Sequence, residues 1–334
     1  MEQPETYLSS PLSVTWSLSF RCNFDCRHCY SRGDTSPELP LDDLKRLVDV
    51  LVAHGVCFAS FGGGEPLLFA DLYPLAAYAS EQGLKVSLNS NGYLLDRAVA
   101  ERLKEAGFAS VGISLDSHLA PLHDAFRNRP GSFARAIQAL DHLRDAGVKS
   151  TLSTVISRIN HEHLREIAAL AREHGVAQLF LHNFKCSGKG LANMAELDLT
   201  PEEWRRFYQA ALSLKAELAD LPLSFDDPVM ATLEGAERHP LVKGSTCGKI
   251  SLNIRPNGDV TPCGFLPLVL GNLLRDDLDE LWHNSPVLAA LRNKRPTGKC
   301  ARCASYGECL GGCSARAYAL NGTFEAPDPH CWVG

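Results

Sequence analysis

The chain has 334 residues, of which 45% are hydrophobic and 22% charged, and its formal net charge is -6. This length and composition predict a globular protein with one large domain or a large and a small one. The negative charge argues against nucleic acid or an anionic membrane as a partner, and no apolar run is long enough to span a bilayer. The first residues lack a signal-peptide pattern, so we expect a cytoplasmic protein.

Strand-like and helical segments alternate through the first two thirds of the chain. The six expected strands span residues 14–20, 57–61, 84–89, 110–115, 149–156 and 177–182. The expected helices span residues 41–54, 71–82, 96–106, 132–146 with Ser132 as its cap, 161–174, and about 201–220 with a capped start at Thr200. Strands joined by crossover helices form parallel sheets, so we predict an α/β fold with a partial (β/α)6 barrel of the TIM type.

Three cysteines stand directly after the first expected strand. Cys22, Cys26 and Cys29 form a C-x3-C-x2-C array, followed by Tyr30. Three thiolates on one short loop can hold three irons of a cubane cluster and leave the fourth iron open. Thiolates also suit zinc, but a closed zinc site needs a fourth ligand, and His28 is poorly placed for this role beside Cys29. Because the catalytic face of such barrels lies after the strands, we expect this loop on that face.

A glycine-rich loop, Gly-Gly-Gly-Glu-Pro at residues 62–66, follows the second expected strand. Glycines let a backbone approach a ligand closely, although a glycine run alone is also an ordinary tight turn. One β/α unit after the cysteine array, this loop resembles the GGEP motif of radical S-adenosylmethionine (SAM) enzymes, as the array resembles their cluster-binding signature. The resemblance implies a catalytic [4Fe–4S] cluster on the three cysteines, with Tyr30, Gly63, Gly64 and Glu65 at SAM.

Polar residues end the third and fourth expected strands. The resemblance assigns Asn89 or Ser90, and Ser114, to the ribose and carboxylate of SAM, and Arg127 to a salt bridge with that carboxylate. From the residues alone, these are equally well polar strand ends, turn residues and a surface arginine. The loop at 182–190 contains Cys186, which is a hydrogen donor, a cluster ligand or inert. Cys57 falls in an expected strand and is predicted to be a small core residue.

Seven of the twelve cysteines lie between Cys247 and Cys331. In a chain without a signal peptide, clustered cysteines indicate metal binding rather than disulfides. Paired C-x2-C type spacings such as these also occur in zinc sites. Two apolar segments flank Asn257 and Gly258 and predict a β-hairpin between Cys247 and Cys263. The seven-cysteine order resembles the SPASM extension of radical SAM enzymes. We therefore expect an N-terminal segment at 1–12, a barrel at 13–220, a linker at 221–246 and a SPASM domain at 247–334.

The SPASM resemblance implies two auxiliary [4Fe–4S] clusters in addition to the first. The outer cluster would be held by Cys300, Cys303, Cys309 and Cys331, and the inner one by Cys247, Cys263 and Cys313. Two cubanes need eight thiolates, so the inner cluster would have an open iron, a non-cysteine ligand or Cys186.

The resemblance implies an oxidoreductase that reductively cleaves SAM to a 5'-deoxyadenosyl radical, which abstracts a hydrogen atom from the substrate. SPASM enzymes are mostly maturases, so a peptide or protein substrate is expected, with a flavodoxin- or ferredoxin-type electron donor and a separate recognition protein. Gly264 follows Cys263 where sulfatase-maturing enzymes carry an acidic residue, which disfavours formylglycine formation. The alternatives are tetrapyrrole side-chain modification in haem or haem d1 biosynthesis and, remotely, a non-catalytic zinc or electron-transfer protein.

Overall fold

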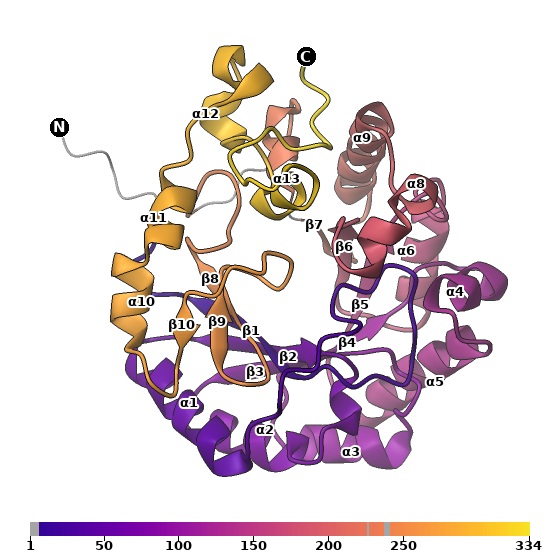
Figure 1. Ribbon diagram of the computed structural model, residues 1–334. Coiled ribbons are helices and arrows are strands. Elements are labelled where there is room, and N and C mark those ends of the chain that lie inside the picture. The colour runs from indigo at the N-terminus through magenta and orange to yellow at the C-terminus, as the bar shows by residue number, and fades with distance from the viewer. Residues whose placement is uncertain (1–6, 226, 237–240) are drawn as a thin grey trace.

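The computed structural model describes residues 7–225, 227–236 and 241–334 (Figure 1). One sheet runs through this part of the chain, with the strand order β10-β9-β8-β1-β2-β3-β4-β5-β6-β7. Strands β1 to β7 are parallel to their neighbours, which confirms the α/β fold and the parallel sheet. Their bounds are β1 (Ser13–Ser19), β2 (Phe58–Gly63), β3 (Lys85–Ser90), β4 (Ser110–Ser114), β5 (Ser150–Ile156), β6 (Leu179–Asn183) and β7 (Leu223–Phe225).

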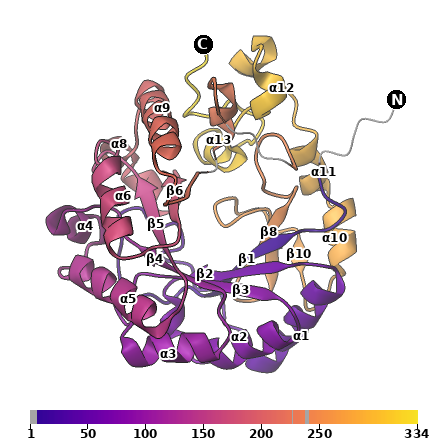
Figure 2. The same ribbon diagram turned by 180° about the vertical axis from the view of Figure 1, so that it is seen from behind.

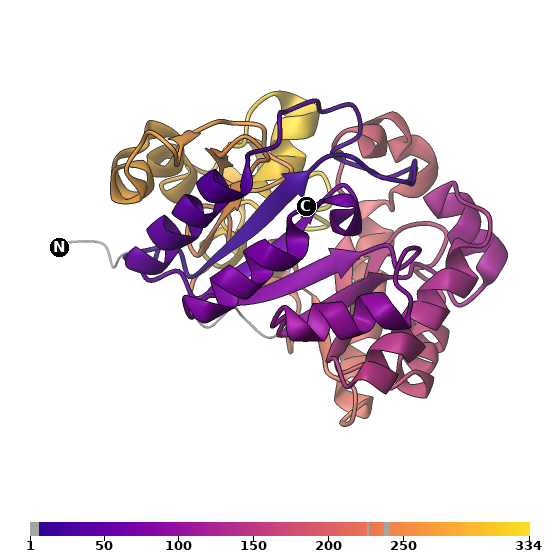
Figure 3. The same cartoon turned by 90° about the horizontal axis from the view of Figure 1, so that it is seen from below.

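Helices cover the outer, convex face of this curved sheet, as Figures 1 and 3 show. They are α1 (Leu41–Ala53), α2 (Leu72–Glu81), α3 (Arg97–Glu105), α4 (Ala120–Arg127), α5 (Ser132–Ala146) and α6 (Leu164–Glu173). Each amphipathic helix turns its apolar side to the strands: Leu44, Leu47 and Leu51 of α1, for example, are at most 1% exposed. Because β1 to β6 are parallel, the strand ends that the sequence predicted to carry the chemistry lie at the same end of the barrel.

Three local predictions are wrong. Helix α4 was not expected, because its start at Leu119 offers no side-chain cap. Helix α5 is capped by Gly131 rather than Ser132, whose hydroxyl instead donates a hydrogen bond to Asp124 at 2.8 Å. Cys57 directly precedes β2 and is exposed, so it is not a core residue.

Beyond β6, the short helices α7 (Lys189–Ala192) and α8 (Met194–Leu197) lead to α9 (Pro201–Glu217). The predicted capped start of α9 is confirmed, since Thr200 and Glu203 form a reciprocal capping box. Part of the segment expected as a linker is strand β7, which pairs in parallel with β6. The sheet thus extends past the six strands that the sequence predicted.

The C-terminal part continues the same sheet. The predicted hairpin is confirmed as β8 (Ser251–Ile254) and β9 (Asp259–Thr261), and β8 pairs with β1. The remaining elements are β10 (Gly271–Asn272), α10 (Leu278–Asn284), α11 (Pro286–Arg292), α12 (Tyr306–Cys309), α13 (Ser314–Asn321) and the 3-10 turns η1 (Pro66–Leu68), η2 (Pro228–Thr232) and η3 (Gly298–Arg302). Helix α13 and the chain end lie between the two edges of the sheet (Figures 1 and 2).

A buried ion-pair network joins this C-terminal part to the far edge of the barrel. Arg316 of α13 is fully buried and pairs with Asp227 at 2.8 Å and with Asp328 at 2.6 Å. Asp227 also accepts hydrogen bonds from Tyr208 of α9 and Asn183 of β6. The two parts therefore share polar as well as strand contacts. Among the described helices, none has the length and apolar character needed to cross a bilayer.

Candidate active site

The loop after β1 brings three thiols together. Cys22, Cys26 and Cys29 are free, with Cys26 buried and the other two half-buried. Burial raises the pKa of Cys26 to about 11, and the neighbouring Cys29 and Cys22 act in the same direction. Three soft sulfur donors that converge on one loop without a disulfide fit a thiolate-held iron site.

The glycine loop packs directly on the cysteine loop. The amide of Gly64 donates to the carbonyl of Ser19 at 2.7 Å, and the amide of Glu65 donates to the carbonyl of Arg21 at 2.8 Å. A Cβ on Gly63 would lie 2.4 Å from the Ser19 oxygen, and one on Gly64 only 2.1 Å from the Arg21 oxygen. Glycine is therefore required at both positions for the two loops to touch. The sequence around the two glycines did not indicate this requirement.

The Glu65 carboxylate faces the protein interior rather than the barrel mouth. It accepts hydrogen bonds from the Ser90 hydroxyl at 2.8 Å and from the backbone amides of Asn91 at 2.8 Å and Leu67 at 3.2 Å. Burial raises the pKa of Glu65, while these donors oppose the increase. The side chains of Glu65 and Ser90 thus fasten the ends of β2 and β3 together, which leaves their backbone groups to face a ligand.

Asn89 and Ser114 occupy neighbouring strand ends. The amide of Asn89 donates to the Ser60 hydroxyl at 2.9 Å, and its side chain is exposed on the sheet. Ser114 ends β4 and is half-buried. Of the two residues predicted for the third strand, Asn89 therefore has the accessible side chain and Ser90 has the buried one.

Arg127 was interpreted either as a partner of the SAM carboxylate or as a surface arginine, and the structure excludes a surface position. It is 8% exposed, and its Nε donates to the Asp116 carboxylate at 2.6 Å. Interactions with Asp116 and Cys26 raise the pKa of Arg127 despite its burial. Asp116 itself is fully buried and also accepts from the amide of Val155 at 3.0 Å. The sequence reasoning missed Asp116, although its place directly after an expected strand was a usable signal.

Tyr30 lies between the three-cysteine loop and the C-terminal hairpin. Its ring packs against Phe265 with 4.8 Å between centroids, and a Cβ on Gly264 would lie 3.4 Å from the ring. Burial raises the pKa of Tyr30, and both Cys29 and Cys263 contribute to the increase. Gly264, which stands where sulfatase-maturing enzymes carry an acidic residue, therefore lies beside the Tyr30 ring.

The C-terminal cysteines lie in two groups in the structure. Cys247, Cys263 and Cys313 form the inner group, in which a hydrogen bond with Cys247 and burial raise the pKa of Cys263. The ammonium of Lys185, from the loop after β6, lies 3.4 Å from the Cys313 sulfur. The outer group lines one small pocket together with Lys299 and Tyr306, and consists of Cys300, Cys303, Cys309 and Cys331. Both groups fit thiolate-held clusters, since each gathers several cysteine sulfurs at one place.

Cys186 has other partners. Its sulfur lies 3.5 Å from the Asp198 carboxylate, and Asp198 also contacts His330. Burial raises the pKa of the Cys186 thiol, and the Asp198 carboxylate acts in the same direction. This placement argues against Cys186 as the missing ligand of the inner group.

Family models match both parts of the chain. Residues 16–171 match the radical SAM superfamily, and residues 246–304 match the SPASM iron–sulfur cluster-binding domain. The chain is 30% identical to an AdoMet-dependent heme synthase of Methanosarcina barkeri, over 97% of each protein. It is 33% identical to the mycofactocin maturase MftC of Mycolicibacterium smegmatis, over 100% of this chain and 86% of that protein.

The structure also resembles Streptococcus suis SuiB solved with its precursor peptide SuiA. The TM-score is 0.80 at 19% identity, over 98% of this chain and 77% of that one. This similarity shows a common fold.

Proposed function

The chain belongs to the radical SAM superfamily and carries a SPASM iron–sulfur cluster-binding domain, and from this premise we propose that it matures a peptide or protein. The observation that carries the proposal is the similarity to a maturase over the whole chain, at 33% identity. The SuiB fold accommodates a precursor peptide, which supports the same substrate class. The two cysteine-lined groups beside the barrel give such an enzyme additional redox sites.

The first cluster would be held by Cys22, Cys26 and Cys29, whose loop the glycine segment supports. The inner auxiliary cluster would be held by Cys247, Cys263 and Cys313, and the outer one by Cys300, Cys303, Cys309 and Cys331. We keep domain bounds of 13–220 for the barrel and 247–334 for the SPASM domain, although the pairing of β8 with β1 joins the two parts into one sheet. With SAM and a [4Fe–4S] cluster bound, reductive cleavage supplies the radical that abstracts a substrate hydrogen atom.

The chain's own residues position the reactants. The backbone at Gly63, Gly64 and Glu65 would meet the methionine part of SAM, because the Glu65 side chain is directed inward. Asn89 and Ser114 present polar groups from adjacent strand ends.

The buried Asp116–Arg127 pair would support the three-cysteine loop, because Arg127 interacts with Cys26. Arg127 already has a carboxylate partner, so it would orient this loop and reach SAM only through its remaining donors. Tyr30, packed between the cysteine loop and the hairpin, would close the space between the first and inner clusters and help to exclude water.

The finer partner assignments are part of the same proposal. A flavodoxin- or ferredoxin-type protein would deliver the electron, and a separate protein would present the substrate. We also retain the cytoplasm as the proposed compartment, because an exposed unpaired thiol such as that of Cys57 is typical of reducing compartments.

Tetrapyrrole modification is the second candidate, and the 30% identity to a heme synthase over nearly the full length of both proteins supports it. The two substrate classes are distinguished by the transfer of deuterium from a labelled substrate to 5'-deoxyadenosine. An extract of the producing organism, grown in deuterated medium, is added to the reconstituted enzyme with SAM and reductant. Deuterium in 5'-deoxyadenosine that disappears after protease treatment of the extract supports a peptide. Transfer that resists protease, together with a mass change of added iron coproporphyrin III, would support the tetrapyrrole instead.

A further inference from the structure

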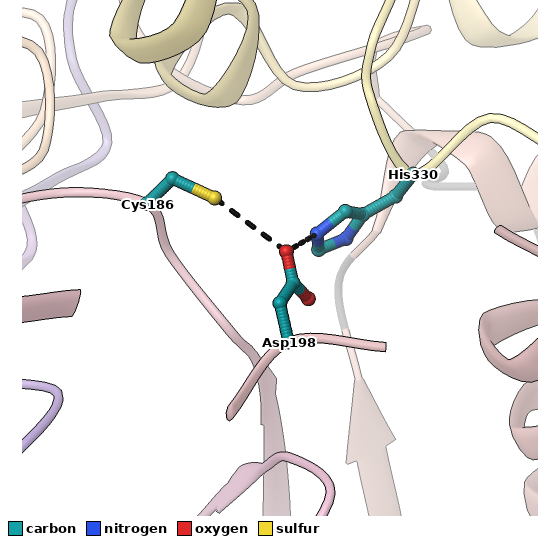
Figure 4. A group of neighbouring side chains, drawn as sticks. All are labelled: Cys186, Asp198 and His330. Carbon is teal, nitrogen blue, oxygen red and sulfur yellow. Dashed lines mark hydrogen bonds and ion pairs between the residues drawn. The ribbon is translucent and has the colours of Figure 1, made fainter. Parts of the chain in front are cut away.

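Three side chains of different chemistry converge at the buried junction between the barrel and the chain end. Cys186 comes from the loop after β6, Asp198 from the turn before α9, and His330 from the C-terminal tail (Figure 4). Their potential ligand atoms all lie within 4.8 Å of one another. Cys186 and His330 are each 1% exposed. None of the three belongs to the cysteine groups assigned to iron–sulfur clusters.

Two of the three donor separations are close to those around a small four-coordinate cation. One Asp198 oxygen, Oδ2, lies 3.5 Å from the Cys186 sulfur and 2.9 Å from Nε2 of His330. Zinc bonds of about 2.0–2.3 Å place tetrahedral ligands roughly 3.2–3.7 Å apart, so these two edges need only small adjustments. The other carboxylate oxygen is held by the amide of Leu199 at 2.8 Å and the indole of Trp204 at 3.1 Å, which orients Oδ2 toward the thiol and the imidazole.

The charges around the cluster also favour a cation. The junction contains three carboxylates, and the buried cations near them are the Arg316 guanidinium and the Lys185 ammonium. The carboxylates are those of Asp198, Asp227 and Asp328. At neutral pH this leaves one excess negative charge in a poorly solvated region, an arrangement that is costly unless it is compensated. A divalent ion together with a thiolate adds one positive charge and balances the junction.

We propose that Cys186, Asp198 and His330 form a structural site for a divalent transition metal, with zinc as the preferred ion and water as the fourth ligand. One sulfur, one nitrogen and one oxygen donor form a borderline-soft set that zinc accepts. Binding releases the Cys186 thiol proton to solvent and moves the imidazole proton to Nδ1, so that Nε2 is free to coordinate. The ion fastens the tail that carries Cys331 to the barrel loop that carries Lys185.

The test is zinc binding to the iron-loaded protein. After anaerobic reconstitution with iron and sulfide, zinc chloride is added and unbound zinc is removed by gel filtration. Metal analysis gives zinc and iron per chain, and X-ray absorption at the zinc edge gives the ligand set without interference from iron. We expect one zinc per chain with a single sulfur neighbour and otherwise nitrogen or oxygen.

The matched variants are Cys186→Ala and Cys57→Ser, which remove a proposed ligand and an exposed thiol that lies outside every cysteine group. Cys186→Ala should lower zinc affinity about tenfold or more, with unchanged iron, whereas Cys57→Ser should bind zinc as the wild type does. If Cys186→Ala folds poorly, Cys186→Ser replaces it in the test. Zinc bound to Cys186→Ser should have no sulfur neighbour.

Two results would overturn the site. One is the absence of retained zinc in the wild-type protein. The other is zinc surrounded by three or four sulfurs, because that ligand set belongs to the cysteine groups rather than to Cys186. Neither result depends on SAM cleavage, so failure of this site is distinguishable from failure of the proposed function.

Discussion

The ammonium of Lys185 lies 3.4 Å from the sulfur of Cys313, and this contact links the loop after β6 to the inner cysteine group. The same ammonium lies 5.7 Å from the centroid of the Phe265 ring, next to the cysteine hairpin. Attraction to Cys313, Asp227 and Cys247 keeps the pKa of Lys185 above its ordinary value, despite the opposing effects of burial and Arg316. The barrel therefore places a permanent positive charge beside the inner group.

We expect Lys185→Met to make the reduction potential of the inner auxiliary cluster more negative. The variant removes both the charge and an N–H donor to a ligating sulfur, and each of these stabilises the reduced cluster. Lys185→Arg, which keeps the charge, should cause a smaller shift, and Lys149→Met, at an exposed lysine, should cause none. The measurement is a redox titration followed by electron paramagnetic resonance. An unchanged potential in Lys185→Met would refute this role.

Glu65→Ala should destabilise the protein by about 3 kcal/mol or more, because the Ser90 hydroxyl and the amides of Asn91 and Leu67 lose a buried acceptor. Glu65→Gln, which keeps one acceptor oxygen, should be milder. Anaerobic denaturant unfolding gives the free energies. The control is Glu105→Ala on the exposed side of α3, for which a change within about 0.5 kcal/mol is expected. Equal effects of Glu65→Ala and Glu105→Ala would contradict the assigned contacts.

Arg316→Met should cost about 3–5 kcal/mol, since it leaves the Asp227 and Asp328 carboxylates buried without their cation. The matched variant is Arg165→Met, which removes an ion pair with Glu217 whose side chains are 65% and 50% exposed. Because both side chains are exposed to solvent, that pair should contribute far less than the buried network. Unfolding free energies of the two variants give the comparison, and similar losses would mean that the junction does not depend on Arg316.

Cys300→Ala should reduce the iron content by about four atoms per chain, because it removes one ligand of the outer cluster. SAM cleavage in the absence of substrate should remain, since this cysteine group is separate from the three-cysteine loop. Iron analysis and chromatography of 5'-deoxyadenosine measure both quantities, with Cys57→Ser as the control that changes neither. Full iron content in Cys300→Ala would show that the outer group is not a cluster site.

The sequence predicted what depends on local pattern. The parallel strands, the hairpin at Asn257 and Gly258, and the capping box at Thr200 follow from periodicity, turn residues and capping residues within a few positions of one another. The division of the C-terminal cysteines into two cluster sites came from the SPASM resemblance, and the ligand assignments remain predictions.

The sequence could not provide the contacts between segments that are distant in the chain. Arg127 is buried with Asp116 as its partner, and Cys57 is exposed at the position before β2. Gly63 and Gly64 are required by the backbone of the cysteine loop, and Cys186 contacts Asp198 rather than the inner group. Such pairings arise only when the folded chain brings the segments together, so no local propensity indicates them.

The central claim, radical SAM chemistry at the three-cysteine loop, is tested most directly by SAM cleavage. The anaerobically reconstituted protein is incubated with SAM and a strong reductant, and 5'-deoxyadenosine, methionine and iron are measured. We expect about twelve irons per chain and both products from the wild type, and about eight irons and neither product from Cys26→Ala. A wild-type protein with its full iron content that leaves SAM intact would contradict the account.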